Sequence, residues 1–475
     1  MTALSSLIVN SSARSAAEII NRFGSALFWI VIVRKLGAGS LGSIAFALSL
    51  FSLFHILSTL GLGSMVIRDL ASQRQRAGRY FTHLLLLGAA ASVPLAGLMI
   101  LAAHLIQPQP DTIYATGIMA LALFPASGYY WSKTLLASGE KMKYAALTRT
   151  AENAVKLGLG LTLLFMGMGV REMICVIALS KGVAFALGFT FATRTIAVPE
   201  LSYDPDTLRR LLRHSPAFAS TTLCHALFWS MSVILITEFK GEVEAGWFSA
   251  AFKLVDLPLS LISSFSGALF PVASRVALTD PRLFTRLCVK SVKFMVLLSL
   301  AAAAGGTVFA PALILLLYGP ALQPAAPVFA ILIWLLVPYS LVPVMAYSLV
   351  NHHMQNYDLL ANACAVFCLL VLSLILVPGW GWIGASVSLV LGTWIFAACE
   401  TFWVSKKVYS LQLSAASLRP LFAAAAMVLV LYSTRNYHPY VTLPLGAAAY
   451  TLILWLSKSV TEVDLAFVKQ LRSIS

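Results

Sequence analysis

Long apolar runs follow one another along the whole chain, separated by short polar turns. Each run extends over about 20 residues, the length that an α-helix needs to cross the hydrocarbon core of a bilayer. The residue-by-residue alternation of a transmembrane barrel strand is absent from the sequence. The pattern predicts about fourteen membrane-spanning helices, which begin near residues 8, 41, 80, 112, 144, 171, 215, 246, 288, 325, 359, 382, 416 and 440.

The composition excludes an ordinary water-soluble protein. Of the 475 residues, 59% are hydrophobic and only 11% are charged, whereas soluble domains contain about 25% charged residues. We therefore predict an all-α polytopic membrane protein. The six cysteines lie in or beside apolar runs, as small core residues do, and no motif indicates a cofactor or a metal site.

The net charge of +15 would suggest a nucleic-acid partner in a soluble protein, but here the basic residues lie in alternate loops. If both termini are cytoplasmic, twenty basic residues fall in inner loops and five in outer loops. This is the positive-inside pattern of membrane proteins. It predicts cytoplasmic N- and C-termini, and we expect no nucleic-acid partner.

Parts of the sequence recur at a nearly constant spacing, which indicates an internal duplication. The tetrapeptide ALFW occurs at residues 26–29 and again at residues 226–229. Gly42, which precedes a long apolar run, corresponds in the same way to Gly246, and Pro125 lies near the counterpart of Pro338.

The longest polar connection, residues 193–216, separates the two copies. It predicts an N-lobe of six helices over residues 1–194, a cytoplasmic linker over 195–214 and a C-lobe of six helices over 215–405. Two further helices and a cytoplasmic tail occupy residues 406–475. Because each lobe has an even number of helices, we expect a pseudo-two-fold axis along the membrane normal and a central cleft.

Charged residues also occur inside the apolar runs, where each costs at least about 2.5–3.5 kcal/mol unless a partner or a polar cavity receives it. The bases are Arg14, Arg22, Arg149, Lys156, Lys181 and Lys253, and the acids are Glu18, Glu152 and Asp256. Helical spacing places Arg14, Glu18 and Arg22 on one face, and Arg149, Glu152 and Lys156 on another.

An ion pair that merely joins two helices is an equally good interpretation for any single acid and base. Three acids cannot neutralise six bases, however, so we predict a cationic cleft that binds an anion. The six bases are the candidate substrate ligands, with Arg22 and Lys253 first, and the three acids are candidates for ion coupling. For the mid-span His55 we favour a histidine that a neighbouring helix satisfies by hydrogen bonding.

Three segments resemble the Wzx-like oligosaccharide and polysaccharide flippases of the multidrug/oligosaccharidyl-lipid/polysaccharide (MOP) exporter superfamily. They are VRKLGAGSLGSIAFALSLFSLFHILSTLGLGSMVIRDLAS (33–72), HSPAFAS (214–220) and AGWFSAAFKLVDLPLSLISSFSGALFPVASR (245–275). The resemblance covers residues 5 to 405. It implies a non-enzymatic, alternating-access transporter with a cationic cleft lined by the first, second, seventh and eighth helices, which places Arg22 and Lys253 at that cleft.

The resemblance further implies a substrate and a location. The substrate is an undecaprenyl-pyrophosphate-linked oligosaccharide that crosses the bacterial inner membrane from the cytoplasmic to the periplasmic leaflet, for O-antigen, capsule or exopolysaccharide synthesis. The implied partners are membrane lipids and a polysaccharide polymerase, and we expect a monomer.

Two alternatives carry less weight. A multidrug antiporter of the same superfamily should prefer an acidic and aromatic cavity, which the excess of bases disfavours. A membrane-embedded glycan polymerase or glycosyltransferase needs a sizeable outer loop with charged groups, but the first predicted outer loop, RKLGAGS at residues 34–40, has no carboxylate.

Overall fold

The structure is a computed structural model, and it describes residues 2–107, 109–200, 204–409, 419–434, 439–457 and 459. Within its helices, the side chains of residues 2–20, 22, 71, 72, 206, 214, 217, 218, 271, 278 and 439 fall outside the described part.

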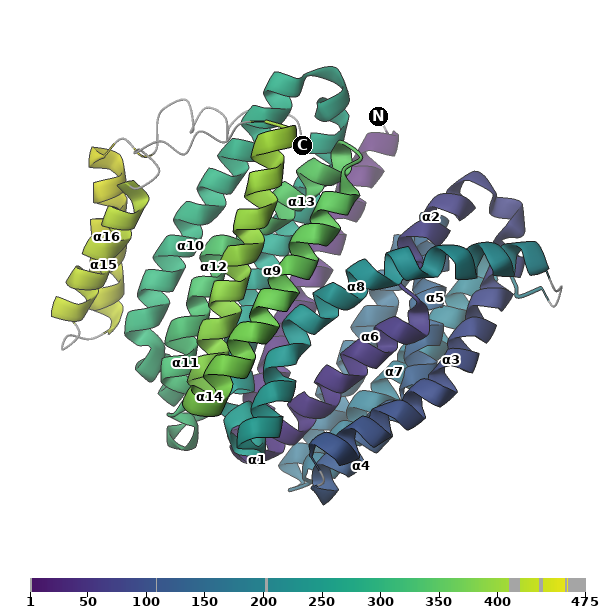
Figure 1. The fold of residues 1–475 in the computed structure, drawn as a ribbon, viewed down its shortest axis with the longest axis horizontal. Coiled ribbons are helices and arrows are strands. Elements are labelled where there is room, and N and C mark those ends of the chain that lie inside the picture. The colour runs from purple at the N-terminus through teal and green to yellow at the C-terminus, as the bar shows by residue number, and fades with distance from the viewer. Residues whose placement is uncertain are drawn as a thin grey trace. The chain divides into compact units, whose positions relative to one another are not determined.

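All regular structure in these ranges is helical (Figure 1). In chain order the helices are α1 (Thr2–Thr59), α2 (Gly63–Ser72), η1 (Arg74–Arg76), α3 (Ala77–Ile106), α4 (Pro110–Leu121), α5 (Leu123–Ser138), α6 (Met142–Phe165), α7 (Val170–Thr195), α8 (Pro205–Lys240), α9 (Glu242–Thr279), α10 (Pro281–Tyr318), η2 (Pro320–Leu322), α11 (Ala325–Leu332), η3 (Ile333–Leu335), α12 (Leu336–Tyr339), α13 (Val342–Asn351), α14 (Gln355–Lys407), α15 (Arg419–Ser433) and α16 (Pro439–Leu456).

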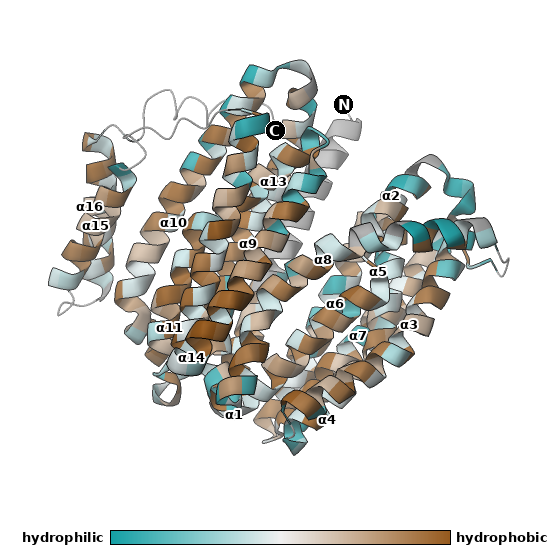
Figure 2. Ribbon diagram, viewed as in Figure 1, coloured by the Kyte–Doolittle hydropathy of each residue, from teal (hydrophilic) through white to brown (hydrophobic). Residues whose placement is uncertain are grey.

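The all-α polytopic membrane fold is confirmed. Eight helices in the described ranges are long and apolar enough to cross a membrane. Figure 2 shows mostly hydrophobic residues along α3 and α10, whereas hydrophilic residues gather on α2 and the first turns of α8. The apolar runs therefore form the spanning segments, and the polar connections lie at their ends.

Two long helices each contain two of the predicted spans, because a glycine divides them. Gly37 in α1 has φ 79° and Gly381 in α14 has φ 52°, a left-handed backbone that glycine adopts without a steric penalty. Gly241, between α8 and α9, has φ 85°. It lies 204 residues after Gly37, which is the spacing that relates Gly42 to Gly246 in the predicted duplication.

The helix pairs around these turns pack at reciprocal positions. A Cβ atom on Gly42 would overlap the backbone carbonyl of Glu242, and a Cβ atom on Gly246 would overlap that of Ala38. Ala38 and Glu242 are themselves related by the same spacing, so each copy presents the same position to the other. A two-fold relation produces such exchanged contacts, and the local backbone thus supports the duplication.

Proline breaks one span in each half of the sequence. Pro125 follows the interruption between α4 and α5, and Pro338 and Pro343 accompany the breaks between α11, α12 and α13. Proline lacks the backbone N–H and clashes with the preceding turn, which interrupts a helix. These broken helices correspond to the predicted spans at 112 and 325.

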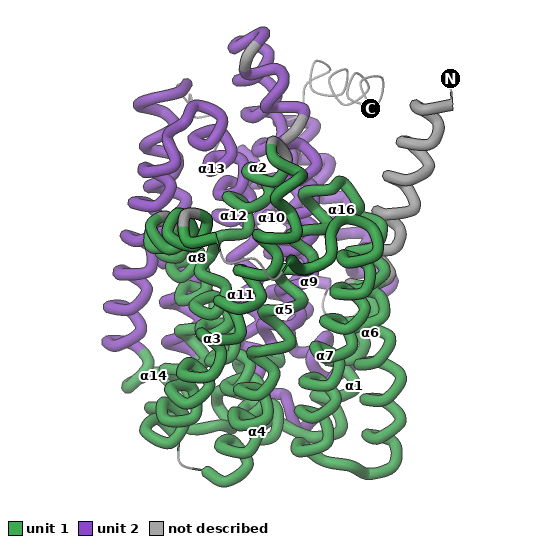
Figure 3. Tube along the Cα trace, turned by 90° about the vertical axis from the view of Figure 1, so that its right-hand side faces the viewer, with its two compact units in different colours: residues 1–250, 377–382 green, residues 251–376, 383–475 purple. Residues whose placement is uncertain are grey.

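The described chain forms two compact units, which we call unit 1 and unit 2 (Figure 3). Unit 1 comprises Met1–Ala250 and Val377–Trp382, and unit 2 comprises Ala251–Leu376 and Ile383–Ser475. The lobe boundaries that we drew from the sequence, at residues 195–214 and 405, remain a prediction.

Within unit 2, the last two helices pack against each other and onto α10. Tyr450 on α16 donates a hydrogen bond to the backbone carbonyl of Leu297 on α10 at 2.7 Å. A buried hydroxyl in a membrane helix needs such an acceptor. The bond therefore fixes the α15–α16 pair to one helix of unit 2.

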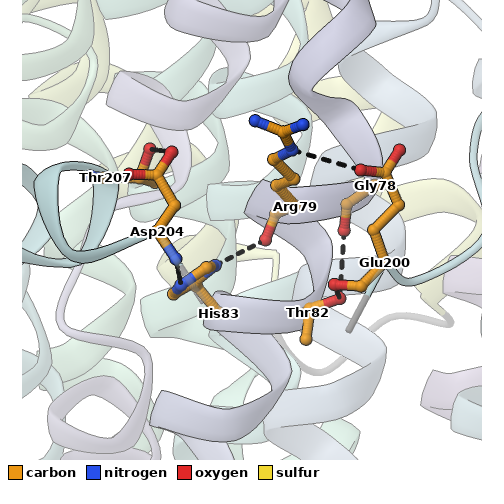
Figure 4. A network of polar contacts seen from close by, with 7 residues as sticks. All are labelled: Gly78, Arg79, Thr82, His83, Glu200, Asp204 and Thr207. Carbon is orange, nitrogen blue, oxygen red and sulfur yellow. Dashed lines mark hydrogen bonds and ion pairs between the residues drawn. The ribbon is translucent and has the colours of Figure 1, made fainter. Parts of the chain in front are cut away.

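The segment after α7 is bound to the start of α3 within unit 1 (Figure 4). Arg79 Nε lies 3.2 Å from Glu200 Oε2, and Thr82 Oγ1 donates to the backbone carbonyl of Glu200 at 2.8 Å. The backbone N–H of Glu200 in turn donates to the carbonyl of Gly78. Backbone and side-chain bonds together hold this connection against α3.

A histidine completes the attachment. Asp204 donates its backbone N–H to His83 Nε2 at 3.2 Å, so Nδ1 carries the proton and donates to the carbonyl of Arg79 at 2.8 Å. The carboxylate of Asp204 accepts the backbone N–H of Thr207 at 3.1 Å and thereby caps α8. The next residue is Pro205, and proline is favourable in the first turn of a helix. Helix α8 therefore begins at Pro205, inside the linker that we predicted over residues 195–214.

Candidate functional site

Helices α1, α6 and α7 of unit 1 contact one another, and amide side chains join the first two. Asn21 on α1 donates from Nδ2 to Thr150 Oγ1 on α6 at 2.9 Å. Asn153 Nδ2 on α6 donates to Asn21 Oδ1 at 3.1 Å. Both asparagines are buried. Hydrogen bonds between membrane helices hold their relative register, so the polar face of α6 is fixed against α1.

The charged centre of this helix group is Glu152. Its Oε1 atom accepts from Lys156 Nζ, one turn along α6, at 3.2 Å and from Lys181 Nζ on α7 at 2.7 Å. The side chain of Glu152 is 7% exposed, and those of Lys156 and Lys181 are 20% and 25% exposed. The structure thus brings together three of the predicted site residues. It also shows that the side chain of Lys181 on α7 points toward Glu152 on α6.

Both lysines border a cavity of about 290 Å³ inside unit 1. The lining residues come from both segments of α1 and from α6 and α7: Ser25, Phe28, Trp29, Leu48, Phe51, Ser52, His55, Asn153, Lys156, Leu157, Ile177 and Lys181. Glu152 does not line the cavity. The wall therefore presents ammonium groups and aromatic rings, with the carboxylate behind them.

The charge balance of this site is positive. One carboxylate receives two ammonium groups, which leaves one positive charge without a matching negative charge in this triad. Such a charge is costly in a membrane unless a polar cavity or an anion receives it. The contacts of Glu152 with Lys156 and Lys181 are therefore ion pairs, as one of the two sequence interpretations proposed. The single carboxylate nevertheless balances only one of the two positive charges.

The other predicted site residues lie elsewhere or outside the described side chains. Arg149 lies on the exposed surface of α6. Lys253 and Asp256 belong to α9 in unit 2, where Asp256 is exposed. The side chains of Arg14, Glu18 and Arg22 fall outside the described residues, although their backbone belongs to α1.

His55 differs from the sequence interpretation. One ring nitrogen bonds to the backbone of Ala126, as expected, but Nε2 is buried without a hydrogen-bond partner among the described residues. The ring stacks on Phe51 with centroids 5.5 Å apart and borders the cavity. Sequence reasoning missed this because a lone histidine in an apolar run does not reveal which helices surround it.

Among the described residues, no group of three or more His, Cys, Asp or Glu side chains is placed to hold a metal ion. The cavity's own groups are ammonium, imidazole, amide, hydroxyl and aromatic. Ammonium groups bind phosphate as point charges, and a neutral imidazole nitrogen accepts hydrogen bonds from hydroxyl groups. The arrangement can bind an anion that carries hydroxyl-bearing groups.

Comparison with solved structures shows which fold this is. The chain is similar to the lipid II flippase MurJ in an inward closed conformation, with a TM-score of 0.78 and 14% identity over 96% of this chain and 99% of that one. It is also similar to an inward-facing multidrug resistance MATE transporter of the MOP superfamily, with a TM-score of 0.68 and 15% identity over 82% of this chain and 94% of that one.

A third similar structure is a MOP superfamily transporter from Pyrococcus furiosus, described as having a binding pocket of reverse polarity. Its TM-score is 0.60, with 15% identity over 83% of this chain and 93% of that one. At these identities the likeness shows the fold alone. Together with the eight helices that are long and apolar enough to span a membrane, it defines a multi-pass membrane protein with the fold of these transporters.

The chain belongs to the family of polysaccharide biosynthesis proteins, whose model matches residues 31–327. No curated protein matches the sequence. The family resemblance that we described from the sequence is thereby confirmed.

Proposed function

We propose that this protein is a flippase that moves an undecaprenyl-pyrophosphate-linked oligosaccharide from the cytoplasmic to the periplasmic leaflet of the bacterial inner membrane. Transport by alternating access would serve the synthesis of O-antigen, capsule or exopolysaccharide. The observation that carries this proposal is the unit 1 cavity, where Lys156 and Lys181 share the single carboxylate of Glu152.

The chemistry of that substrate matches the cavity. A pyrophosphate cannot enter hydrocarbon without losing its hydration, which is very costly for an ion. A positive cavity lowers this barrier while the lipid tail stays in the bilayer. Small-molecule sites occupy about 300–1,000 Å³, so a cavity of about 290 Å³ suits the charged linkage and the sugar next to it rather than a whole glycan.

The aromatic lining supports the same substrate. Phe28, Trp29 and Phe51 border the cavity, and their rings offer apolar faces against which a sugar ring can pack. The ring of His55, which stacks on Phe51, adds to this aromatic surface. Moving a lipid-linked glycan requires no covalent step, so we propose that the protein is not an enzyme.

The remaining sequence candidates keep their proposed roles. Arg22, Lys253 and Arg149 are proposed substrate ligands, with Arg22 and Lys253 on the pyrophosphate, and Arg14 is proposed to steer the substrate into the cleft. Glu18 and Asp256 stay candidates for ion coupling. For Glu152 the contacts favour a different role, since it accepts from both cavity lysines and so restrains their positions.

We further propose cytoplasmic N- and C-termini, because this orientation places most basic loops inside. Membrane lipids surround the protein, which we propose acts as a monomer, and a polysaccharide polymerase is the proposed protein partner. The fold is shared with multidrug transporters, but a cavity whose charged lining groups are lysines is a poor site for cationic drugs.

Flipping of a fluorescent lipid-linked pyrophosphate glycan in proteoliposomes tests the proposal. Hydrogen bonds to charged groups contribute roughly 1.5–3 kcal/mol, so Lys156→Gln and Lys181→Gln should each weaken apparent affinity roughly 10- to 100-fold. Lys143→Gln is the matched control, because Lys143 lies on the same helix and is exposed.

Arg22→Ala and Lys253→Ala test the two further ligands in the same assay. Loss of flipping is expected in both, with normal insertion into the membrane. Full flipping by the Lys156 and Lys181 variants would remove the basis of the proposal. Full flipping by the Arg22 and Lys253 variants would limit the ligands to the two cavity lysines, Lys156 and Lys181.

A further inference from the structure

Unit 2 contains an acidic residue for which the flippase proposal has no role. Glu400 lies on the second segment of α14, and its exposed fraction is 0%. Both carboxylate oxygens are buried, and among the described residues no hydrogen-bond donor reaches either of them. A carboxylate with neither water nor a donor is among the most costly groups to bury.

The group that contacts Glu400 is a second acid. Asp358 lies in the first turn of α14, close enough to Glu400 to act on its charge. The two segments of α14 pack against each other at this level, where the ring centroids of Tyr357 and Trp403 are 4.4 Å apart. The other titratable groups near this position are the free thiols of Cys364, Cys368 and Cys399. Among the described residues, no cationic side chain reaches the carboxylate oxygens of Glu400.

The lysines that follow Glu400 along the helix have other contacts. Lys406 Nζ lies over the Phe402 ring, 5.6 Å from its centroid, and Lys407 Nζ lies 5.9 Å from the centroid of the Tyr357 ring. Cation–π contacts of this kind keep an ammonium group over an aromatic face. Neither lysine therefore serves as the counter-ion of Glu400.

Two carboxyl groups can form a hydrogen bond only if one of them carries a proton. Asp358 is half-buried and lies at a helix N-terminus, where the helix dipole favours a negative charge. Glu400 is enclosed and has no such support. A proton held between the two carboxyl groups is therefore placed on Glu400, the enclosed member of the pair.

We propose that Asp358 and Glu400 form a proton-binding site in unit 2. A hydronium ion gives its proton to the Asp358 carboxylate, and Asp358 then passes it to the Glu400 carboxylate, so that a water molecule is released and no electrons are exchanged. A hard metal cation takes about six oxygen ligands, and no group of three or more His, Cys, Asp or Glu side chains among the described residues is placed to hold a metal ion.

Infrared spectroscopy of the purified full-length protein tests this proposal without any transport substrate. At neutral pH the carbonyl-stretch band of protonated carboxylic acids should contain one component that disappears in Glu400→Gln. Glu238→Gln is the control, because Glu238 on α8 is exposed and should leave the band unchanged. If Glu400→Gln does not fold, Glu400→Asp must shift the same component.

A second measurement separates a proton relay from a static hydrogen bond. Transfer into D₂O should shift the component as the proton exchanges, and Asp358→Asn should slow that exchange on the order of a hundredfold, since a positioned acid–base group typically contributes at least that factor. The proposal is overturned if the component persists in Glu400→Gln, if Asp358→Asn exchanges at the wild-type rate, or if sodium in place of potassium removes the component.

Discussion

Glu152 in unit 1 and Glu400 in unit 2 are both buried in membrane helices, with exposed fractions of 6% and 0%, yet their surroundings are opposite. Glu152 accepts hydrogen bonds from two ammonium groups, whereas Glu400 meets another acid and no donor. Burial alone therefore does not determine the charge state of an acid. The neighbours do, because they supply or withhold the compensation for lost hydration.

The two neighbourhoods lead to different chemistry. Around Glu152 the bases exceed the acid by one charge, so the cavity attracts an anion. Around Glu400 the acids have no base, so the site attracts a proton. In our proposals, one fold thus has a binding site for an anionic substrate in unit 1 and a binding site for a proton in unit 2.

The largest expected effect comes from removing the charge of Glu152. Glu152→Gln leaves Lys156 and Lys181 without their shared counter-ion, and breaking a buried pair in this way costs about 3–5 kcal/mol. Thermal unfolding of the detergent-purified protein should show a strongly lowered midpoint, which inorganic pyrophosphate partly restores. A midpoint close to that of wild type would show that the negative charge of Glu152 is not needed to balance the two lysines, and that Glu152 does not differ from Glu400 in this respect.

A double variant should make the surroundings of Glu152 resemble those of Glu400, by removing the two ammonium groups. Lys156→Met combined with Lys181→Met removes both donors, so Glu152 should take up a proton and add a component to the carbonyl-stretch band. Stabilisation by pyrophosphate, about 2.7 kcal/mol at a hundredfold excess over Kd, should vanish. Retained stabilisation would mean that the anion binds elsewhere, and Lys143→Gln again serves as the control.

The smallest expected effect belongs to Glu400→Gln. An amide is isosteric with the protonated acid and can still donate to Asp358, so the change in stability should stay below about 1 kcal/mol. The same unfolding measurement checks this value beside Glu152→Gln. A loss as large as that of Glu152→Gln would indicate that Glu400 is ionised and has a cationic partner.

Much of the fold could be predicted from the sequence because it depends on local properties. Apolar runs of spanning length must become helices in lipid, which offers no partner for an unpaired backbone group. Glycine and proline marked the turns and the broken spans. The start of α8 was harder to predict, because its cap and its attachment to α3 depend on Asp204 and His83, which are 121 residues apart.

The candidate site was only partly predictable. The pair of Glu152 and Lys156 follows from helical spacing, but the contact between Glu152 and Lys181 joins two helices and has no signal in the sequence. Glu400 was absent from the three acids that we counted inside the apolar runs, because it lies close to Lys406 and Lys407 near the end of a run. There it resembles a charge at the membrane boundary.

The sequence by itself determined that this protein is a helical membrane protein, where its spans lie, and that its spans carry more bases than acids. These properties depend on composition and on periodicities of one helix. Only the tertiary structure decided which charges meet. Whether a buried acid stays ionised depends on groups a few ångströms away in space, and in this protein those groups are Lys181 for Glu152 and Asp358 for Glu400, each on a different helical segment from its partner.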